Sequence, residues 1–168
     1  MKLSKLVRAL IAPALPLYAN TQAMCTSFKG ELLVGHHNFG TGVTRGSTAA
    51  DTIKAALYLA SATYGASTTA YSTTGEVTGT NYTAGGVTVT NATPPSTSGT
   101  TAIWTPSASL AWTTVTLSTA FDAVLLYNST QSNKAISVHT FGSQTVTAGN
   151  FTLTMPTNDA SNALIRLA

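Results

Sequence analysis

The fold is decided by residues 121–141, FDAVLLYNSTQSNKAISVHTF. Residues 123–127 form a continuous apolar run, which is typical of a strand that is covered on both faces. After a polar loop, residues 135–141 alternate in character, so that Ile136 and Val138 share one face of a second strand. The stretch therefore predicts an inner strand beside a half-exposed neighbour in one sheet.

Short apolar or alternating segments recur along the rest of the chain, between turns rich in glycine, serine, threonine and proline. We expect further strands within residues 53–60, 86–90, 101–104, 112–119, 151–155 and 163–167. Together with the opening pair they make about eight short strands at a spacing of roughly 8 to 12 residues. This pattern predicts a mainly β protein, built as an antiparallel β-sandwich or a jelly roll.

Charged residues are scarce in this chain. They make up 8% of its 168 residues, although 43% are hydrophobic, whereas about a quarter of an average soluble domain is charged. Threonine occurs 32 times, and its hydroxyl covers a surface without charge while its branched Cβ favours strands. A surface with so few charges is poorly protected against association. The composition therefore predicts that this surface meets other protein in an assembly.

Residues 1–20 differ from the rest of the chain. Their three basic residues account for the whole net charge of +3, which leaves the remainder neutral. The basic start and apolar middle are like those of a secretion signal, but Pro13 and Pro16 interrupt the apolar run. We therefore interpret this segment as an N-terminal arm, followed by a single β-sandwich domain over residues 21–168.

The apolar residues of the arm follow a helical spacing and form one face. They are Leu3, Leu6, Val7, Leu10 and Ile11. An amphipathic segment of this length is unstable in isolation, and it is far shorter than the ~20 residues that a membrane span needs. We expect these five residues to be assembly contacts through which the arm docks on a neighbouring subunit, with no membrane as partner.

A short helix is predicted over residues 21–33, at the start of the domain. Met24, Phe28 and Leu32 recur there at four-residue spacing. The glycine-rich residues 34–51 that follow are typical of a loop.

No pattern in the chain indicates catalysis, a metal or a cofactor. The ionisable candidates are Glu31, Asp51, Glu76, Asp122, Asp159, His36, His37 and His139. None lies in a catalytic or phosphate-binding signature, and the adjacent His36 and His37 have no third ligand nearby. Cys25 has no activating neighbour, and the neutral body lacks the basic surface of a specific nucleic-acid binder. We therefore predict that the protein is not an enzyme and holds no cofactor.

Five segments of the body carry a likeness to known proteins. They are TQAMCTSFK followed by ELL (21–29 and 31–33), IKAALY (53–58), SATYGASTTAYSTTGEVTGTNYTAGG (61–86), AVLLYNST (123–130) and NDASNALIRLA (158–168). On these segments the chain resembles, over about residues 21–168, a family of small virion structural proteins of tailed bacteriophages. The most specific part is EVTGTNYTAGG, residues 76–86, whereas residues 1–20 extend beyond the resemblance. The resemblance implies a component of the virion without an enzymatic activity.

The resemblance, the charge-poor body and the apolar arm together lead us to expect a capsid cement or decoration protein. Such a protein binds between subunits of the major capsid protein, as a dimer or a trimer, and stabilises the head. A tail, collar or head-fibre component is one alternative. A carbohydrate-binding surface module is another, if Trp104, Trp112 and Tyr82 share one exposed face; a buried aromatic core is the favoured explanation of the same residues.

Overall fold

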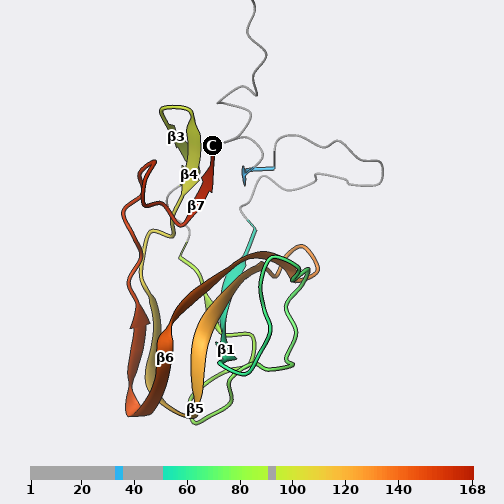
Figure 1. Ribbon diagram of the computed structural model, residues 1–168, viewed down its shortest axis with the longest axis vertical. Coiled ribbons are helices and arrows are strands. Elements are labelled where there is room, and N and C mark those ends of the chain that lie inside the picture. The colour runs from blue at the N-terminus through green and yellow to red at the C-terminus, as the bar shows by residue number, and fades with distance from the viewer. Residues whose placement is uncertain (1–32, 36–50, 91–93) are drawn as a thin grey trace, which may run out of the picture.

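The computed structural model describes residues 33–35, 51–90 and 94–168 (Figure 1). Its seven strands are β1 (Ile53–Leu59), β2 (Val87–Thr88), β3 (Ser96–Ser98), β4 (Thr101–Trp104), β5 (Leu110–Asn128), β6 (Lys134–Leu153) and β7 (Ile165–Leu167). Leu33 is helical, but the rest of the predicted helix lies outside the described residues. So does the predicted arm with its candidate contacts Leu3, Leu6, Val7, Leu10 and Ile11.

The strands form two antiparallel sheets, one with the order β2-β1-β5-β6 and one with the order β3-β4-β7. β5 is an inner strand of the larger sheet. Its C-terminal part pairs with β1, from Asn128 opposite Ile53 to Phe121 opposite Leu59. On its other side β5 pairs with β6 over the full length of both strands. The prediction of a mainly β fold with antiparallel sheets is therefore confirmed.

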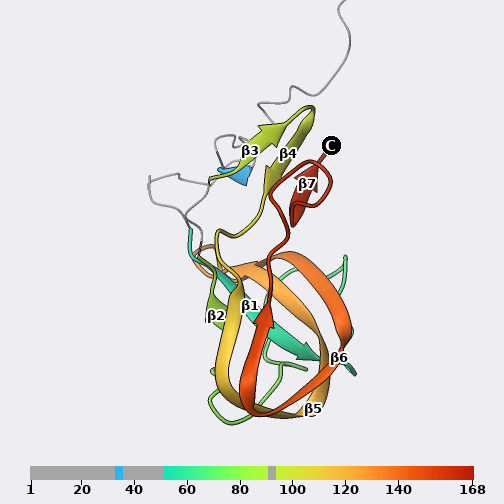
Figure 2. The same ribbon diagram turned by 90° about the vertical axis from the view of Figure 1, so that its left-hand side faces the viewer.

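β5 and β6 are much longer than the sequence pattern indicates. Residues 112–119 and 123–127, predicted as two strands, are parts of β5, which has 19 residues. Residues 135–141 and 151–153 are likewise parts of β6, which has 20. The expectation of about eight short strands is wrong because the threonine, serine and glycine residues between the apolar runs continue the ladder instead of ending it. The two long strands curl together around β1 (Figure 2).

Irregularities in the β5–β6 pairing bend this long pair. One register shift lies between Trp112 and Val115, where Thr114 has a φ of 54°. Thr114 N–H donates to Asn150 Oδ1 at 2.8 Å, and Asn81 Nδ2 donates to the carbonyl oxygen of Thr114 at 2.8 Å. Because bulges increase twist and bend a strand, these asparagine side chains stabilise the curl.

The apolar run of β5 is buried on both faces, as its sequence predicts. Val124 and Leu126 belong to the main core, whereas Ala123, Leu125 and Tyr127 belong to a second cluster on the opposite face. All five side chains are buried. Fully burying a large aliphatic side chain contributes about 1.5–3 kcal/mol, so this run fixes the sheet between two layers.

The smaller sheet shares the main core of the larger one. Trp104 of β4 is buried in that core, and Ile165 of β7 packs against it. Next to the pair of Trp104 with Ile165, Leu164 N–H donates to Thr105 Oγ1 at 3.0 Å. Figure 1 shows the smaller sheet at the end of the molecule where the C-terminus lies.

Residues 60–86 form a long irregular segment that covers both faces of the larger sheet. Tyr71 packs on the second cluster, whereas Val77 and Tyr82 pack on the main core. Glu76 lies where the segment passes from one face to the other, and it forms a bridge to the edge of β1. The segment therefore wraps around this edge of the sheet.

Gly86 ends this segment in close contact with β1. It has a φ of +69°, and a Cβ at this position would lie 1.8 Å from the carbonyl oxygen of Ala55. Only glycine adopts this conformation readily and allows so close a backbone approach.

Replacing Gly86 by alanine should lower the free energy of unfolding by about 3 kcal/mol, because a strained backbone and an overpacked site each cost about 1–3 kcal/mol. The matched control is Gly65→Ala, since a Cβ at Gly65 has no atom within 4 Å. Urea unfolding of both variants measures the difference. Equal stability of the two would contradict this account of Gly86.

Candidate functional site

The ionisable residues singled out in the sequence do not gather at one place in the described structure. Asp51 accepts a hydrogen bond from Asn128 Nδ2 at 2.6 Å beside the β5–β6 loop. Asp159 lies in an exposed turn, where bonds from Asn162 and Thr157 hold its pKa well below the usual range. Glu31, His36, His37 and Cys25 lie outside the described residues. Within the described ranges, no group of three His, Cys, Asp or Glu residues could hold a metal ion.

Glu76 is the one buried carboxylate of the described residues, with 5% of its surface exposed. The Tyr71 hydroxyl donates to Oε2 at 2.6 Å. The Tyr82 hydroxyl and the Gly85 N–H donate to Oε1 at 2.8 and 2.7 Å. Hydrogen bonds to a charged acceptor are short and strong. We call Glu76, Tyr71, Tyr82 and Gly85 the Glu76 cluster.

Further bonds attach the Glu76 cluster to the sheet. Leu57 N–H of β1 donates to the Tyr82 hydroxyl at 3.0 Å. The Tyr127 hydroxyl of β5 donates to the carbonyl oxygen of Gly85 at 2.8 Å, and its ring stacks on Tyr71 with centroids 4.6 Å apart. The cluster therefore fastens the covering segment to both β1 and β5.

The tyrosines of the cluster are held in the protonated form. Burial raises the pKa of Tyr71, and the hydrogen bond to Glu76 and the charge of Glu76 raise it further. Burial also raises the pKa of Tyr82, against a lowering by the bond from Leu57 N–H. Burial likewise raises the pKa of Tyr127. Tyr71 and Tyr82 therefore stay able to donate to the Glu76 carboxylate well into the alkaline range.

The hydrogen bonds around Glu76 have a structural role. Donors of the same chain occupy both carboxylate oxygens, and they come from segments on either face of the sheet. Sequence reasoning missed this role, although Glu76 begins the distinctive run EVTGTNYTAGG. The signal that could have found it was a lone acidic residue within a stretch rich in tyrosine and glycine.

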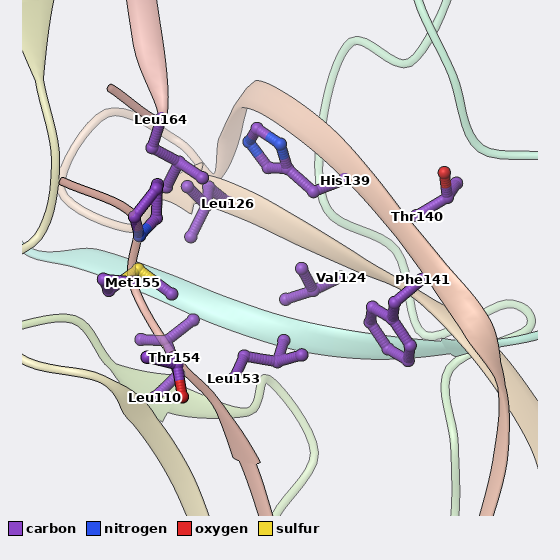
Figure 3. A pocket seen from close by; sticks show the side chains of 11 residues that line it. Leu110, Val124, Leu126, His139, Thr140, Phe141, Leu153, Thr154, Met155 and Leu164 are labelled. Atoms are coloured by element: carbon purple, nitrogen blue, oxygen red, sulfur yellow. The ribbon is translucent and has the colours of Figure 1, made fainter. Parts of the chain in front are cut away.

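Two hollows lie on opposite faces of β6, near its start. The apolar hollow has a volume of about 140 Å³ and is lined mainly by Val124, Leu126, Phe141, Leu153 and Leu164 (Figure 3). The mixed hollow has a volume of about 350 Å³, and its lining includes Tyr64, Thr68, Leu125, Ile136 and Val138. An apolar cavity of about 150 Å³ stays dry and binds a molecule of the size of benzene. The apolar hollow is therefore large enough for one apolar side chain.

His139 stands at the wall of the apolar hollow on β6, as the sheet residue that the sequence predicts. Its Nε2 lies 2.9 Å from Ser137 Oγ. Burial lowers the pKa of His139, which favours the neutral ring. Within the described part of the chain, no carboxylate forms a hydrogen bond with this histidine, as the acidic residue of a hydrolytic triad does.

Trp104 and Trp112 lie in the core, with 5% and 3% of their surface exposed. The Trp112 ring packs against Phe151 with centroids 5.8 Å apart. The two indoles therefore do not form an exposed platform on which a sugar could stack.

In comparisons with family models, curated proteins and solved structures, nothing matches the chain. Among the residues that the structure describes, no helix has the length and apolar character to cross a bilayer.

Replacing Glu76 by glutamine should lower the free energy of unfolding by about 2–3 kcal/mol, because buried donors lose a charged acceptor and one amide group faces the Tyr71 hydroxyl. Asp122→Asn is the matched control, since Asp122 is only partly buried and its carboxylate accepts no hydrogen bond from the described residues. Chemical unfolding compares the two. A loss no larger in Glu76→Gln than in Asp122→Asn would show that the cluster does not hold the fold.

The raised pKa values of Tyr71, Tyr82 and Tyr127 predict that the protein loses stability in alkali. An unfolded tyrosine ionises near pH 10, so the contribution of these groups is complete below that pH and falls as pH rises above it. Urea midpoints measured across this range test the prediction. A Tyr82→Phe variant should show a shallower decline, and a midpoint independent of pH in the wild type would contradict the account.

Proposed function

We propose that this protein is a structural component of the virion of a tailed bacteriophage, a capsid cement protein that binds between major capsid protein subunits. The resemblance of residues 21–168 to small virion structural proteins supports the proposal that the protein is a component of the virion. The physical character of the described surface supports the role in assembly.

The observation that carries the proposal is the scarcity of charge on a large exposed β surface. Most of β6 is exposed or half-exposed, and from Ala135 to Leu153 it contains no Lys, Arg, Asp or Glu. The centre of a protein interface is depleted of charged residues, because each buried charge must be desolvated and paired. A surface of threonine, serine and asparagine offers hydrogen bonds to a partner without that cost.

The construction of the body supports a role in holding subunits together. β5 and β6 are paired along their whole length, and residues 60–86 are fastened across both faces of the sheet by the Glu76 cluster. Backbone ladders and a doubly covered sheet give a body that keeps its shape when its neighbours pull on it. A cement protein needs this property, because it resists the outward pressure of packaged DNA.

The copy number in purified particles tests the proposal. Quantitative mass spectrometry of intact virions should find this protein in numbers comparable to those of the major capsid protein, and cross-linking should join the two. A copy number far below that of the capsid protein, with cross-links to tail or collar proteins, would favour the tail or collar alternative. Absence from purified virions would refute a structural role in the particle.

A further inference from the structure

The outer edge of β6 has no strand partner among the described residues beyond its first two positions. β6 is the last strand in the order β2-β1-β5-β6. At its start the edge is occupied, because Ala135 N–H donates to the carbonyl oxygen of Thr69 and Tyr71 N–H donates to that of Asn133. From Ile136 onward no described segment pairs with it. A row of backbone donors and acceptors therefore faces outward along residues 136–153.

This edge lacks the charges and the proline that often protect an edge strand, and its bulges lie outside the stretch from Ser137 to Thr140. Natural edges are kept apart by short length, by lysine or other charges, or by proline. β6 has 20 residues, and residues 135–153 contain no charged residue and no proline. Its pairing with β5 runs without a register shift from Ser137 to Thr140. That part of β6 is therefore a regular strand onto which another strand can be added.

The two hollows lie on opposite faces of this same part of β6. Val138 lines the mixed hollow, whereas His139 and Phe141 line the apolar hollow. Thr140 borders both hollows. Figure 3 shows His139 and Phe141 on the side of β6 that faces Val124 and Leu126. A strand added to a sheet edge points alternate side chains to opposite faces, where hollows give it specificity.

The chemistry of the edge favours a second copy of this chain as the added strand. Two identical edges that pair must not bring like charges together, and residues 135–153 carry none. If antiparallel pairing is centred on Val138, the two copies of Lys134 lie about 27 Å apart along the strands, beyond the screening length of about 8 Å. Ile136, which is 40% exposed, would then lie opposite Thr140 of the second copy and be covered.

We infer that two copies of this protein associate through residues 136–141 of β6, which pair antiparallel about a two-fold axis at Val138 and join the two larger sheets. Side chains of β6 in each copy then lie next to the two hollows that border β6 of the other copy. The two-fold arrangement is closed, so it uses both free edges and leads to a dimer instead of a fibre. This deepens the proposed function by naming the surface where one copy meets the next.

The variant Ile136→Lys places a charge on the edge at an exposed position, and Leu167→Lys is its matched control. The side chain of Ile136 is 40% exposed and that of Leu167 is 37% exposed, but only Ile136 lies on the proposed interface. Sedimentation equilibrium should find a wild-type dimer. It should find the dissociation constant of Ile136→Lys raised by roughly tenfold or more, since about 1.4 kcal/mol is a factor of ten, and that of Leu167→Lys unchanged.

A cysteine at the two-fold axis gives a positive test that does not depend on weakening the fold. In a background with Cys25→Ser, Val138→Cys should form a disulfide between two copies, because directly opposed strand residues have Cα separations of about 4.5–5.5 Å, within the range of a disulfide. Thr152→Cys, on the same strand but far from the axis, should not. A wild-type monomer, or cross-linking no greater at position 138 than at position 152, would overturn the inference. These experiments measure association in solution, independently of the virion. A dimer in solution that is absent from virions would refute only the proposed function. A monomer in solution that is present in virions would refute only this inference.

Discussion

The structure depends on burying the five apolar residues of β5, Ala123 to Tyr127, on both faces of one sheet. Such a run needs a strand on each side and a layer over each face. β1 and β6 supply the strands, the main core covers one face, and Ala62, Tyr64 and Tyr71 of the segment 60–86 pack on the other. This arrangement places β6 at the edge of the sheet. The same constraint that stabilises the body therefore leaves one long strand without a described neighbour along most of its outer side.

The Glu76 cluster holds the irregular segment of residues 60–86 against the larger sheet. Residues 60–86 have little regular pairing of their own, so their position depends on side chains. Glu76 accepts bonds from Tyr71 on one face and Tyr82 on the other, at the point where the segment passes the edge of β1. A buried charge that is fully bonded fixes one arrangement, because any other would leave it unpaired. This explains why a body with so little charge keeps one carboxylate inside.

The sequence predicts the parts of this fold that are determined locally. The apolar run of β5, the loop after Asn128 and the strands β1 and β4 follow from apolar runs, alternation and turn residues. The length of β5 and β6 does not follow from the sequence pattern, because weakly apolar threonine-rich stretches become strand only through pairing with each other. Glu76 was missed for a similar reason. Its tyrosine partners are close in sequence, but its burial depends on Tyr127 and β1, which lie far along the chain.

Hydrogen–deuterium exchange followed at low and high protein concentration tests the central claim, that residues 123–127 of β5 are buried within each copy, whereas the outer edge of β6 is covered only when a second copy binds there. Amides of residues 123–127 should be strongly protected at every concentration, since they open only with the whole fold. Amides of residues 136–141 that face outward should exchange quickly in dilute solution and become protected as concentration rises. Rapid exchange at 123–127, or exchange at 136–141 that does not change with concentration, would contradict the account.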